Sequence, residues 1–286
     1  MDKPAHRRMR PLLGTFVEIA VRAPEPLAET AIASAFATIE QIQRHMSFHD
    51  ADSDLSRINL HAWRRPVSVS SDIYRVLCHA RHISRRSNGL FDISIGGRLV
   101  AEGRLPDHGF PALDAEGWDA LELLPRLRVR LKRPVVLTLD GIAKGYAVDC
   151  AVQTLFTHGI TRGLVNAGGD LRLFGPDALP IAVREASGAI TPLGEWSNTA
   201  MATSAVGLSA EDQARFPSCI VTPHGCDGLA CPHFNQCPRA WTVLADEAWR
   251  ADALTKVAAL APEAGRSARI ARLGGRLIAH DFGRGE

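Results

Sequence analysis

Two glycine turns with charged neighbours lie close together in this sequence. The first, Asp140-Gly141, precedes a helical pattern whose first turn carries Lys144. Free amide groups at a helix N-terminus attract anions, and an ammonium there is unfavourable unless an anion is bound. The second, Gly168-Gly169-Asp170, allows the backbone to approach whatever the first turn holds. Together the turns predict a site for a phosphorylated ligand, although a solvent-facing Lys144 and an ordinary tight turn would also explain them.

The elements that position these turns follow from the spacing of apolar residues. Residues 135–139 are apolar and β-branched, which predicts a strand, and residues 163–167 predict another. Between them, apolar residues recur at helical spacing from Ala143, and Gly159 stands where a helix needs a left-handed residue after its end. The expected order is strand, turn, helix, strand, turn.

The rest of the chain contains further strands and amphipathic helices that do not alternate regularly, which indicates an α+β fold. The expected elements are a strand at Leu12–Val21, a helix opened by Pro24 and Pro26, a polar loop at Ser47–Asn59, a helix capped by Ser71 and closed by Asn88-Gly89, loops with an edge hairpin at Gly103–Pro134, strand and turn at Pro180–Glu195, and a small-residue stretch at Thr199–Ser204.

The composition is that of an ordinary globular protein. The chain has 286 residues, of which 46% are hydrophobic and 22% charged, with a formal net charge of +2. So small a net charge implies no general attraction to nucleic acid. No apolar run of signal-peptide or membrane-spanning length follows the polar residues 1–10, so we expect a cytoplasmic protein that does not insert into membranes.

Six motifs in a fixed order resemble the ApbE family, the FAD:protein FMN transferases. The most diagnostic is Asp140-Gly-Ile-Ala-Lys-Gly-Tyr-Ala-Val-Asp149 followed by Val165-Asn-Ala-Gly-Gly-Asp170. The others are Pro11-Leu-Leu-Gly-Thr15, the segment Met46 to Asn59, Gly89-Leu-Phe-Asp-Ile93, Ala202-Thr-Ser204 and Ala251-Asp-Ala-Leu254. Such an ordered set is more specific than any single motif.

The resemblance implies a fold and an activity. It implies one domain over residues 1–286, built as two interleaved α+β lobes in a T-fold-like arrangement, with a flavin nucleotide between them. It further implies a magnesium-dependent enzyme that binds FAD as its substrate. A threonine of a client flavoprotein would attack the phosphorus nearer the flavin and release AMP, which requires charge neutralisation and in-line placement.

The resemblance also implies which residues act. The expected flavin-nucleotide site is Met46, Ser47, Asn59, Asp92, Gly141, Lys144, Gly168, Gly169, Asp170, Thr203 and Ser204. Met46, Ser47 and Asn59 are expected near the flavin, although His49 replaces the usual aromatic residue of their segment. Asp92 could equally be a plain turn residue.

The chain departs from the family pattern where the catalytic base is expected. The family carries a histidine and an aspartate after the Ala202-Thr-Ser204 motif, and here Cys219 and Thr222 occupy those positions. Cys219 could act as a base only with a lowered thiol pKa, and His224 is a second candidate. These two residues are the expected catalytic residues.

The expected metal site departs as well. The family pattern places a carboxylate and a hydroxyl four residues apart on one helix face, which suits Mg²⁺. Here the position four residues after Asp252 is Lys256, and Thr255 precedes it. We expect Asp140, Asp252 and Thr255 as ligands. Lys256 could instead neutralise pyrophosphate charge, or merely form a surface ion pair with Asp252.

A cysteine-rich segment, residues 225–239, is expected as an insertion within the domain. Its cysteines and neighbouring histidines could bind zinc or lie beside an iron–sulfur cluster, and could equally be reduced thiols or form a disulfide; these residues are Cys226, Cys231, Cys237, His224 and His233.

The departures keep two other functions open. One is an FAD-binding protein without transfer activity that serves as a carrier, sensor or assembly partner. The other is an FAD pyrophosphatase, in which water replaces the threonine as acceptor.

Overall fold

The computed structural model describes residues 5–184, 189–206, 220–221 and 239–278. Its elements are β1 (Ala5–Leu12), β2 (Thr15–Arg22), α1 (Glu25–Met46), α2 (Asp54–His61), β3 (Val67–Ser68), α3 (Ser71–Arg86), α4 (Gly96–Ala101), η1 (Trp118–Ala120), β4 (Leu121–Leu124), β5 (Arg128–Leu131), α5 (Ala143–Thr157), β6 (Gly163–Ala167), β7 (Asp170–Phe174), β8 (Leu179–Arg184), β9 (Ile190–Trp196), β10 (Ala200–Val206), β11 (Arg239–Ala245), α7 (Ala248–Leu260), α8 (Arg266–Arg272) and β12 (Gly275–Ile278).

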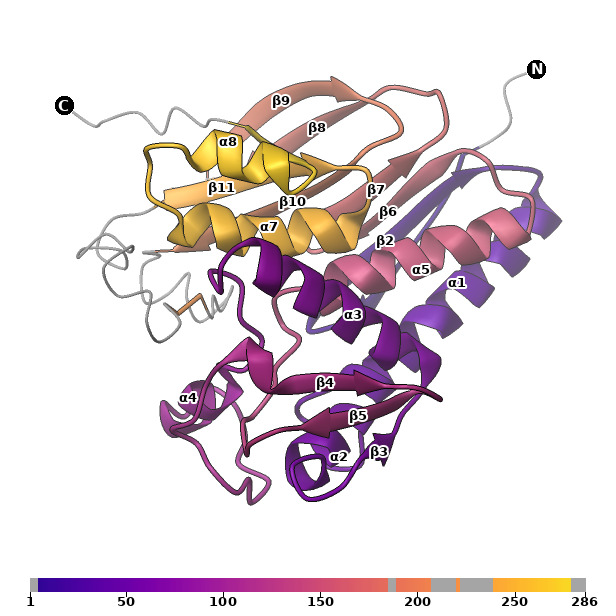
Figure 1. Cartoon of the computed structure of the whole chain (residues 1–286). Helices are drawn as coiled ribbons and strands as arrows, with labels where there is room; N and C mark the ends of the chain where they lie inside the picture. The colour runs from indigo at the N-terminus through magenta and orange to yellow at the C-terminus, as the bar shows by residue number, and fades with distance from the viewer. Residues whose placement is uncertain (1–4, 185–188, 207–219, 222–238, 279–286) are drawn as a thin grey trace.

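The larger lobe is a seven-stranded antiparallel sheet in the order β1-β2-β6-β7-β10-β11-β12. Helices α1, α5 and α7 cover one face of this sheet (Figure 1). On the other face, Leu171, Leu173 and Met201 pack in a second apolar cluster with Ile181 of the β8–β9 hairpin. Both faces of the sheet centre are therefore buried.

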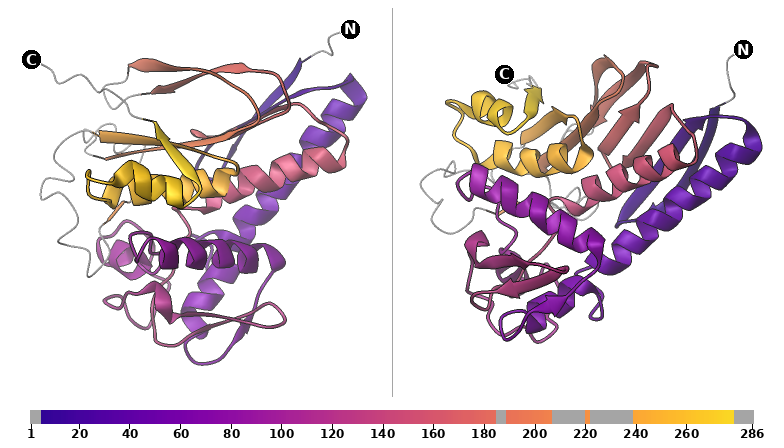
Figure 2. Two further views of the ribbon diagram at one scale, coloured as in Figure 1. Left: turned by 45° about the horizontal axis from the view of Figure 1, so that its top comes forward. Right: turned by 45° about the vertical axis from the view of Figure 1, so that its right-hand side comes forward.

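The smaller lobe is inserted between α1 and α5. It contains α2, α3, α4 and a three-stranded sheet in the order β3-β5-β4. The chain enters this lobe after α1 and returns to the larger sheet through α5, so the two lobes are interleaved (Figure 2). The α+β class is confirmed, and the β4–β5 pair is the hairpin expected within residues 103–134.

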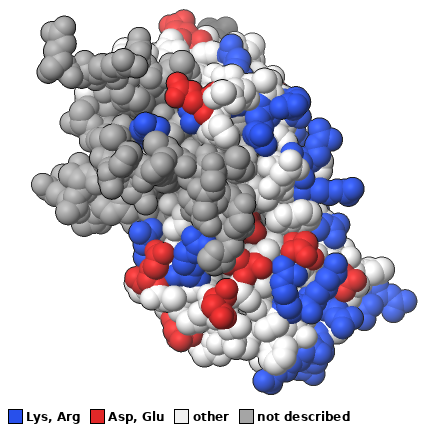
Figure 3. Space-filling view, turned by 60° about the vertical axis from the view of Figure 1, so that its left-hand side comes forward, with Lys and Arg blue, Asp and Glu red and all other residues white. Residues whose placement is uncertain are grey.

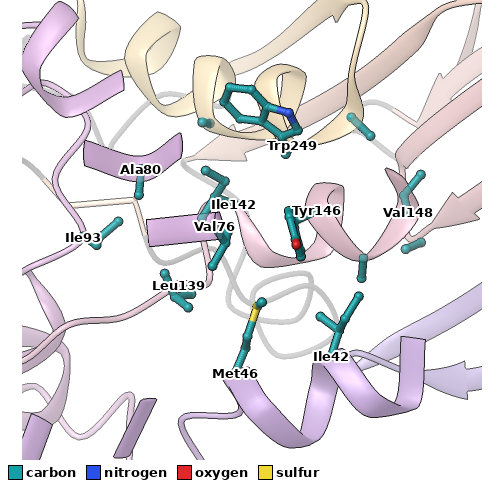
Figure 4. Close-up of a cluster of buried hydrophobic side chains, with 14 of the residues drawn as sticks. Ile42, Met46, Val76, Ala80, Ile93, Leu139, Ile142, Tyr146, Val148 and Trp249 are labelled. Atoms are coloured by element: carbon teal, nitrogen blue, oxygen red, sulfur yellow. The ribbon is translucent and has the colours of Figure 1, made fainter. Parts of the chain in front are cut away.

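A continuous apolar core joins the two lobes. Met46 and Ile42 of α1 lie beside Tyr146 of α5, and Leu139 and Val76 extend the cluster into the smaller lobe (Figure 4). These side chains are at most 5% exposed. Burial of this kind stabilises each large apolar side chain by about 1.5–3 kcal/mol, so the start of α5 is held firmly between the lobes.

The strand expected at residues 135–139 is not formed, and this prediction is wrong. The segment is extended and buried, but only Val136 forms an isolated bridge, with Ile95. Its other hydrogen bonds are made to individual residues and not to a strand. Thr138 donates its N–H to Ile93 O over 2.7 Å, and the side-chain amide of Asn59 bonds to both the N–H and the carbonyl oxygen of Leu137. A buried β-branched run is apolar enough for a strand, but this one meets no neighbouring strand.

The polar loop expected at Ser47–Asn59 is partly a helix. Ser53 caps α2 by accepting the N–H of Ser56 over 3.0 Å, and Leu55 and Ile58 of α2 are fully buried. The cap of α3 is likewise one residue earlier than expected, because Ser70 rather than Ser71 accepts the N–H of Ile73. Both corrections reflect side-chain caps that end the preceding loop sooner.

Candidate functional site

Five charged residues converge where α5, α7 and β7 meet, and we call them the charged cluster. They are Asp140, Lys144, Asp170, Asp252 and Lys256. Asp140 lies in the turn before α5 and Lys144 in the first turn of that helix, while Asp170 begins β7. Asp252 and Lys256 lie on one face of α7. The structure thus brings together both glycine turns and the Ala251–Leu254 motif.

Lys144 does not simply point into water. Its Nζ lies 3.7 Å from Asp170 Oδ2, and 34% of its side chain is exposed. Burial would lower the pKa of Lys144, but the charges of Asp170, Asp252 and Asp140 outweigh this and raise the pKa. The ammonium therefore stays protonated at neutral pH, as an anion-binding role requires.

Asp170 is buried at the start of β7 and close to a second carboxylate. Burial and the charge of Asp252 raise the pKa of Asp170, while Lys144 and Lys256 oppose that rise. A carboxyl group in this position gains a proton more easily than one in water. Protonation of Asp170 would leave the cluster less negative and more favourable to a bound anion.

Asp252 is fully buried and joins α7 to α5. Its Oδ2 accepts the backbone N–H of Gly145 over 3.2 Å, and its Oδ1 forms an ion pair with Lys256 Nζ. Gly145 is required here because a Cβ would lie 2.3 Å from the carbonyl oxygen of Ala248. The close approach of the two helices thus depends on a glycine inside α5.

The glycine turns bring backbone close to the charged cluster. A Cβ at Gly141 would lie 3.6 Å from Lys256 Cε, so this turn rests on the lysine stem. Gly168 and Gly169 form the two-residue β6–β7 turn with φ of 66° and 103°. The second turn is thus a tight hairpin that also delivers Asp170 to the cluster, so the two alternatives of the sequence analysis are compatible.

The hydroxyl groups expected at the ligand lie on β10 and α7. Ser204 Oγ is 2.7 Å from Thr255 Oγ1, and Thr255 also donates to the carbonyl oxygen of Asp252 over 2.7 Å. Thr203 bonds to Thr242 of β11 over 2.7 Å. Ser204 therefore lies beside α7 near the cluster, while Thr203 faces the neighbouring strand.

The residues as placed do not fit a magnesium ion. Both oxygens of Asp252 have protein partners, and the Thr255 hydroxyl is bonded away from them. Asp140 is exposed whereas Asp252 is fully buried. Across the described ranges, no group of three His, Cys, Asp or Glu side chains could hold a metal. A cation at this point would have to displace Lys256.

Three residues expected at the nucleotide, Asn59, Met46 and Ser47, make structural contacts within the protein. Asn59 is fully buried, and its amide donates to Leu137 O over 2.9 Å and accepts Leu137 N–H over 2.8 Å. Met46 packs in the core between the lobes (Figure 4). The carbonyl oxygen of Ser47 accepts Ser53 Oγ over 2.7 Å. Asn59 thereby fixes the segment that leads into Asp140.

Asp92 organises a loop of the smaller lobe. Its Oδ1 accepts the N–H and the hydroxyl of Ser94, each over 2.7 Å, and its Oδ2 accepts the N–H of Trp118 over 3.1 Å. Burial raises the pKa of Asp92 and these hydrogen bonds oppose the rise. The arrangement favours the turn role over direct nucleotide contact.

The expected catalytic residues, Cys219 and His224, lie outside the described residues. The same holds for Thr222 and for residues 225–238 of the cysteine-rich segment, whose last residue, Arg239, begins β11. His49 is described, and it is exposed.

Two positioning residues were missed by sequence reasoning. Gly145 allows α7 to pack closely against α5 because it has no side chain. An isolated glycine inside a helical pattern is the signal that could have indicated this close approach. Asp149 binds the start of α7 and Arg172 of β7. Nothing in the spacing of Asp149 and Arg172 predicts that pair.

Acidic and basic side chains are both present on the face that Figure 3 shows. Among the helices placed in the structure, none combines the length and the apolar character needed to cross a bilayer.

Comparisons with known proteins agree on one family. The sequence model of the protein family described as "ApbE family" matches residues 13–277 of this chain. The FAD:protein FMN transferase of Treponema pallidum is 28% identical over 191 residues, which cover 59% of this chain and 52% of the relative. The chain spans about half the length of the curated relatives it matches.

Solved structures share the fold over nearly the whole chain. The apo flavinyl transferase ApbE of Pseudomonas stutzeri superposes with a TM-score of 0.76 at 21% identity and covers 97% of this chain and 92% of its own. The ApbE protein of Thermotoga maritima gives a TM-score of 0.76 at 24% identity, with 96% and 93% covered.

Proposed function

The chain belongs to the ApbE family, and from this membership we propose that it transfers the FMN moiety of FAD to a threonine of a client flavoprotein. The observation that carries the proposal is the charged cluster between the two glycine turns. Two ammonium groups, Lys144 and Lys256, stand there beside the Asp140-Gly141 turn. Such a site suits the pyrophosphate of a dinucleotide.

The reaction is a substitution at the phosphorus nearer the flavin. The threonine oxygen forms a new P–O bond, and the pyrophosphate P–O bond to the AMP phosphate breaks. The threonine proton passes to a base, and AMP leaves with the electron pair of the broken bond. Phosphoryl transfer of this kind depends mainly on placement and charge stabilisation, which the ammonium groups of Lys144 and Lys256 can supply.

Lys144 is the residue best placed to hold the substrate. Its raised pKa keeps it charged, and a third of its side chain is exposed. Asp170 orients that ammonium, since their atoms are 3.7 Å apart. Gly141, Gly168 and Gly169 then let the backbone approach the phosphates without side-chain obstruction.

The base remains a proposal that rests on sequence. Cys219 occupies the position of the family's histidine, and His224 is the second candidate; neither is among the described residues. If a weak base limits the rate, Cys219→His should raise AMP release by about 10²–10⁴ at most. An unchanged rate in a folded Cys219→His variant, together with a fall in His224→Ala, would assign the base to His224.

One experiment tests the proposed function against its alternatives. The protein is incubated with FAD, with and without a candidate client domain, and AMP and protein-bound flavin are followed. Transfer requires equal amounts of AMP and client-bound flavin, and a client with its acceptor threonine changed to alanine should receive none. AMP without bound flavin would indicate a pyrophosphatase. FAD binding without AMP would indicate a carrier or sensor. A cytoplasmic location stays a prediction, which cell fractionation checks.

A further inference from the structure

Lys256 is the feature of the charged cluster that a metal-dependent site does not explain. Its Nζ forms an ion pair with Asp252 Oδ1 from one turn further along α7. Only 18% of the Lys256 side chain is exposed, and Asp252 is fully buried. The pair is therefore not the surface ion pair that the sequence allowed as an alternative.

The lysine lies at the proposed nucleotide site. A Cβ on Gly141 would be 3.6 Å from Lys256 Cε and 3.8 Å from its Cδ, so the stem runs along the Asp140-Gly141 turn. Its charge also acts on Asp170, which in turn contacts Lys144. The two ammonium groups thus flank the same pair of carboxylates.

We propose that the Lys256 ammonium takes the place of a divalent cation and binds the pyrophosphate of FAD directly, so that FAD binding does not require Mg²⁺. The inference rests on the proposed function for the identity of the ligand. An ammonium has three N–H donors, and Asp252 can engage one of them, which leaves others for phosphate oxygens. A cation beside Asp252 would meet repulsion from both Lys256 and Lys144.

The hydroxyl group that could support a metal is engaged elsewhere. Thr255 is fully buried, and its Oγ1 bonds to Ser204 of β10 and to the carbonyl oxygen of Asp252. Rotating α7 to present Thr255 would break its hydrogen bond to Ser204 of β10 and would also disrupt the bond from the Gly145 N–H of α5 to Asp252. The observed packing therefore favours the ammonium over a metal ion.

Calorimetric titration of FAD into the wild-type protein is the first test. We expect dissociation constants within about twofold of each other in EDTA and in millimolar Mg²⁺. Weakening by about tenfold or more in EDTA, with recovery in Mg²⁺, would overturn the inference and leave the proposed function standing. This comparison requires no variant, so it does not depend on how well a variant folds.

Lys256→Thr supplies the complementary test, because it removes the ammonium and restores a hydroxyl four residues after Asp252. We expect this variant to bind FAD at least about tenfold more weakly in EDTA than in Mg²⁺. Lys132→Thr is the matched control, since Lys132 is exposed and lies outside the charged cluster. A Lys256→Thr variant with wild-type affinity in EDTA would contradict the inference.

Binding of Mn²⁺ alone separates failure of the inference from failure of the proposed function. Titration of Mn²⁺, followed by electron paramagnetic resonance, should show no stoichiometric site in the wild type and one site in Lys256→Thr. A tight Mn²⁺ site in the wild type would overturn the inference whether or not FAD binds. Absence of FAD binding in every buffer would overturn the proposed function and, with it, FAD as the ligand of Lys256, whereas the Mn²⁺ result would still decide whether Lys256 occupies the place of a divalent cation.

Discussion

Two carboxylates connect α5 and α7, and they differ in their cationic partners: the half-buried Asp149 is paired with an arginine and the fully buried Asp252 with a lysine. Asp149 of α5 accepts the N–H groups of Ala248 and Trp249 over 3.0 and 2.9 Å and pairs with Arg172 over 2.6 Å. Asp252 of α7 accepts one N–H from α5 and pairs with Lys256. Each helix thus supplies a carboxylate to the other.

The difference lies in the cations. The Arg172 guanidinium is planar and fixes Asp149 against the positive end of α7, so both groups are committed to structure. Lys256 is a point charge on a flexible stem, and its ammonium keeps donors for a ligand. The contact of Asp149 with the start of α7, which we call the Asp149 end, therefore fixes the geometry of the two helices. The Asp252–Lys256 pair further along α7, which we call the Asp252 end, is available for binding.

The largest effect should come from breaking the Asp149 end. Asp149→Ala leaves Arg172 without its carboxylate and two helix N–H groups without an acceptor. We expect a loss of about 3 kcal/mol in the free energy of unfolding, measured with urea. Asp177→Ala is the control, because Asp177 pairs with arginines on a partly exposed surface and should cost about 0.5 kcal/mol or less. Equal losses would mean that Asp149 is not a structural clamp.

The contact between the helices can be tested at Gly145. In Gly145→Ala the new Cβ would meet the Ala248 carbonyl oxygen at 2.3 Å, which forces α5 and α7 apart. We expect a loss of about 1–3 kcal/mol in unfolding free energy, with weaker FAD binding because the Gly145 N–H to Asp252 is displaced. Gln153→Ala, at an exposed site of the same helix, should change neither quantity. Full stability in Gly145→Ala would show that the helices can separate freely.

Removal of Lys144 tests the binding end. Lys144→Ala deletes an ammonium that stays charged beside Asp170, and we expect FAD affinity to fall at least about tenfold, or roughly 1.4 kcal/mol. Stability should change less than in Asp149→Ala, because a third of the Lys144 side chain is exposed. Calorimetry with Lys132→Ala as control measures the difference. Unchanged affinity would remove Lys144 from the proposed site.

The spacing of apolar residues and the positions of glycines correctly predicted the helix and the turn that form the backbone of the site. Apolar spacing placed α5 and its left-handed Gly159, for which φ is 76°, and the Gly168-Gly169 turn was found where expected. These features depend on a few neighbouring residues. The segment at 135–139 was misread because a strand needs a partner strand, and its partners here are Asn59 and Ile93, which are distant in sequence.

The charges of the site were harder to predict than its backbone. Helical spacing put Asp252 and Lys256 on one face, but it could not tell a surface pair from a buried one, because burial depends on the packing of α7 against α5. The roles of Asp149 and Gly145 have the same origin, since both follow from tertiary contacts. Family motifs supplied Lys144 and Asp170, and the distance between them is a result of the fold.

The smallest effect concerns pH at the Asp149 end of α7. His79 of α3 stacks on Trp249, with ring centroids 4.0 Å apart and an interplanar angle of 20°. Burial lowers the pKa of His79, and the charges of Arg250 and Arg75 lower it further against the opposing effect of Glu247. The unfolded chain therefore binds a proton to this ring at higher pH than the folded protein does.

Where the unfolded state binds more protons than the folded state, the free energy of unfolding rises with pH. As pH falls below about 6.5, the pKa of a histidine in the unfolded chain, protonation of His79 should therefore lower the free energy of unfolding. This loss should stop growing once the pH is below the pKa of His79 in the folded protein. His79→Phe keeps a ring on Trp249 and removes the titration, so its stability should decline less than that of wild type between pH 7 and 5. His61→Gln, at an exposed site, should follow wild type. Urea unfolding across this range measures the slopes, and a steeper decline in His79→Phe would contradict the expected direction of the pH effect.

FAD affinity should not differ between His79→Phe and wild type across the same range if the two ends of α7 act separately.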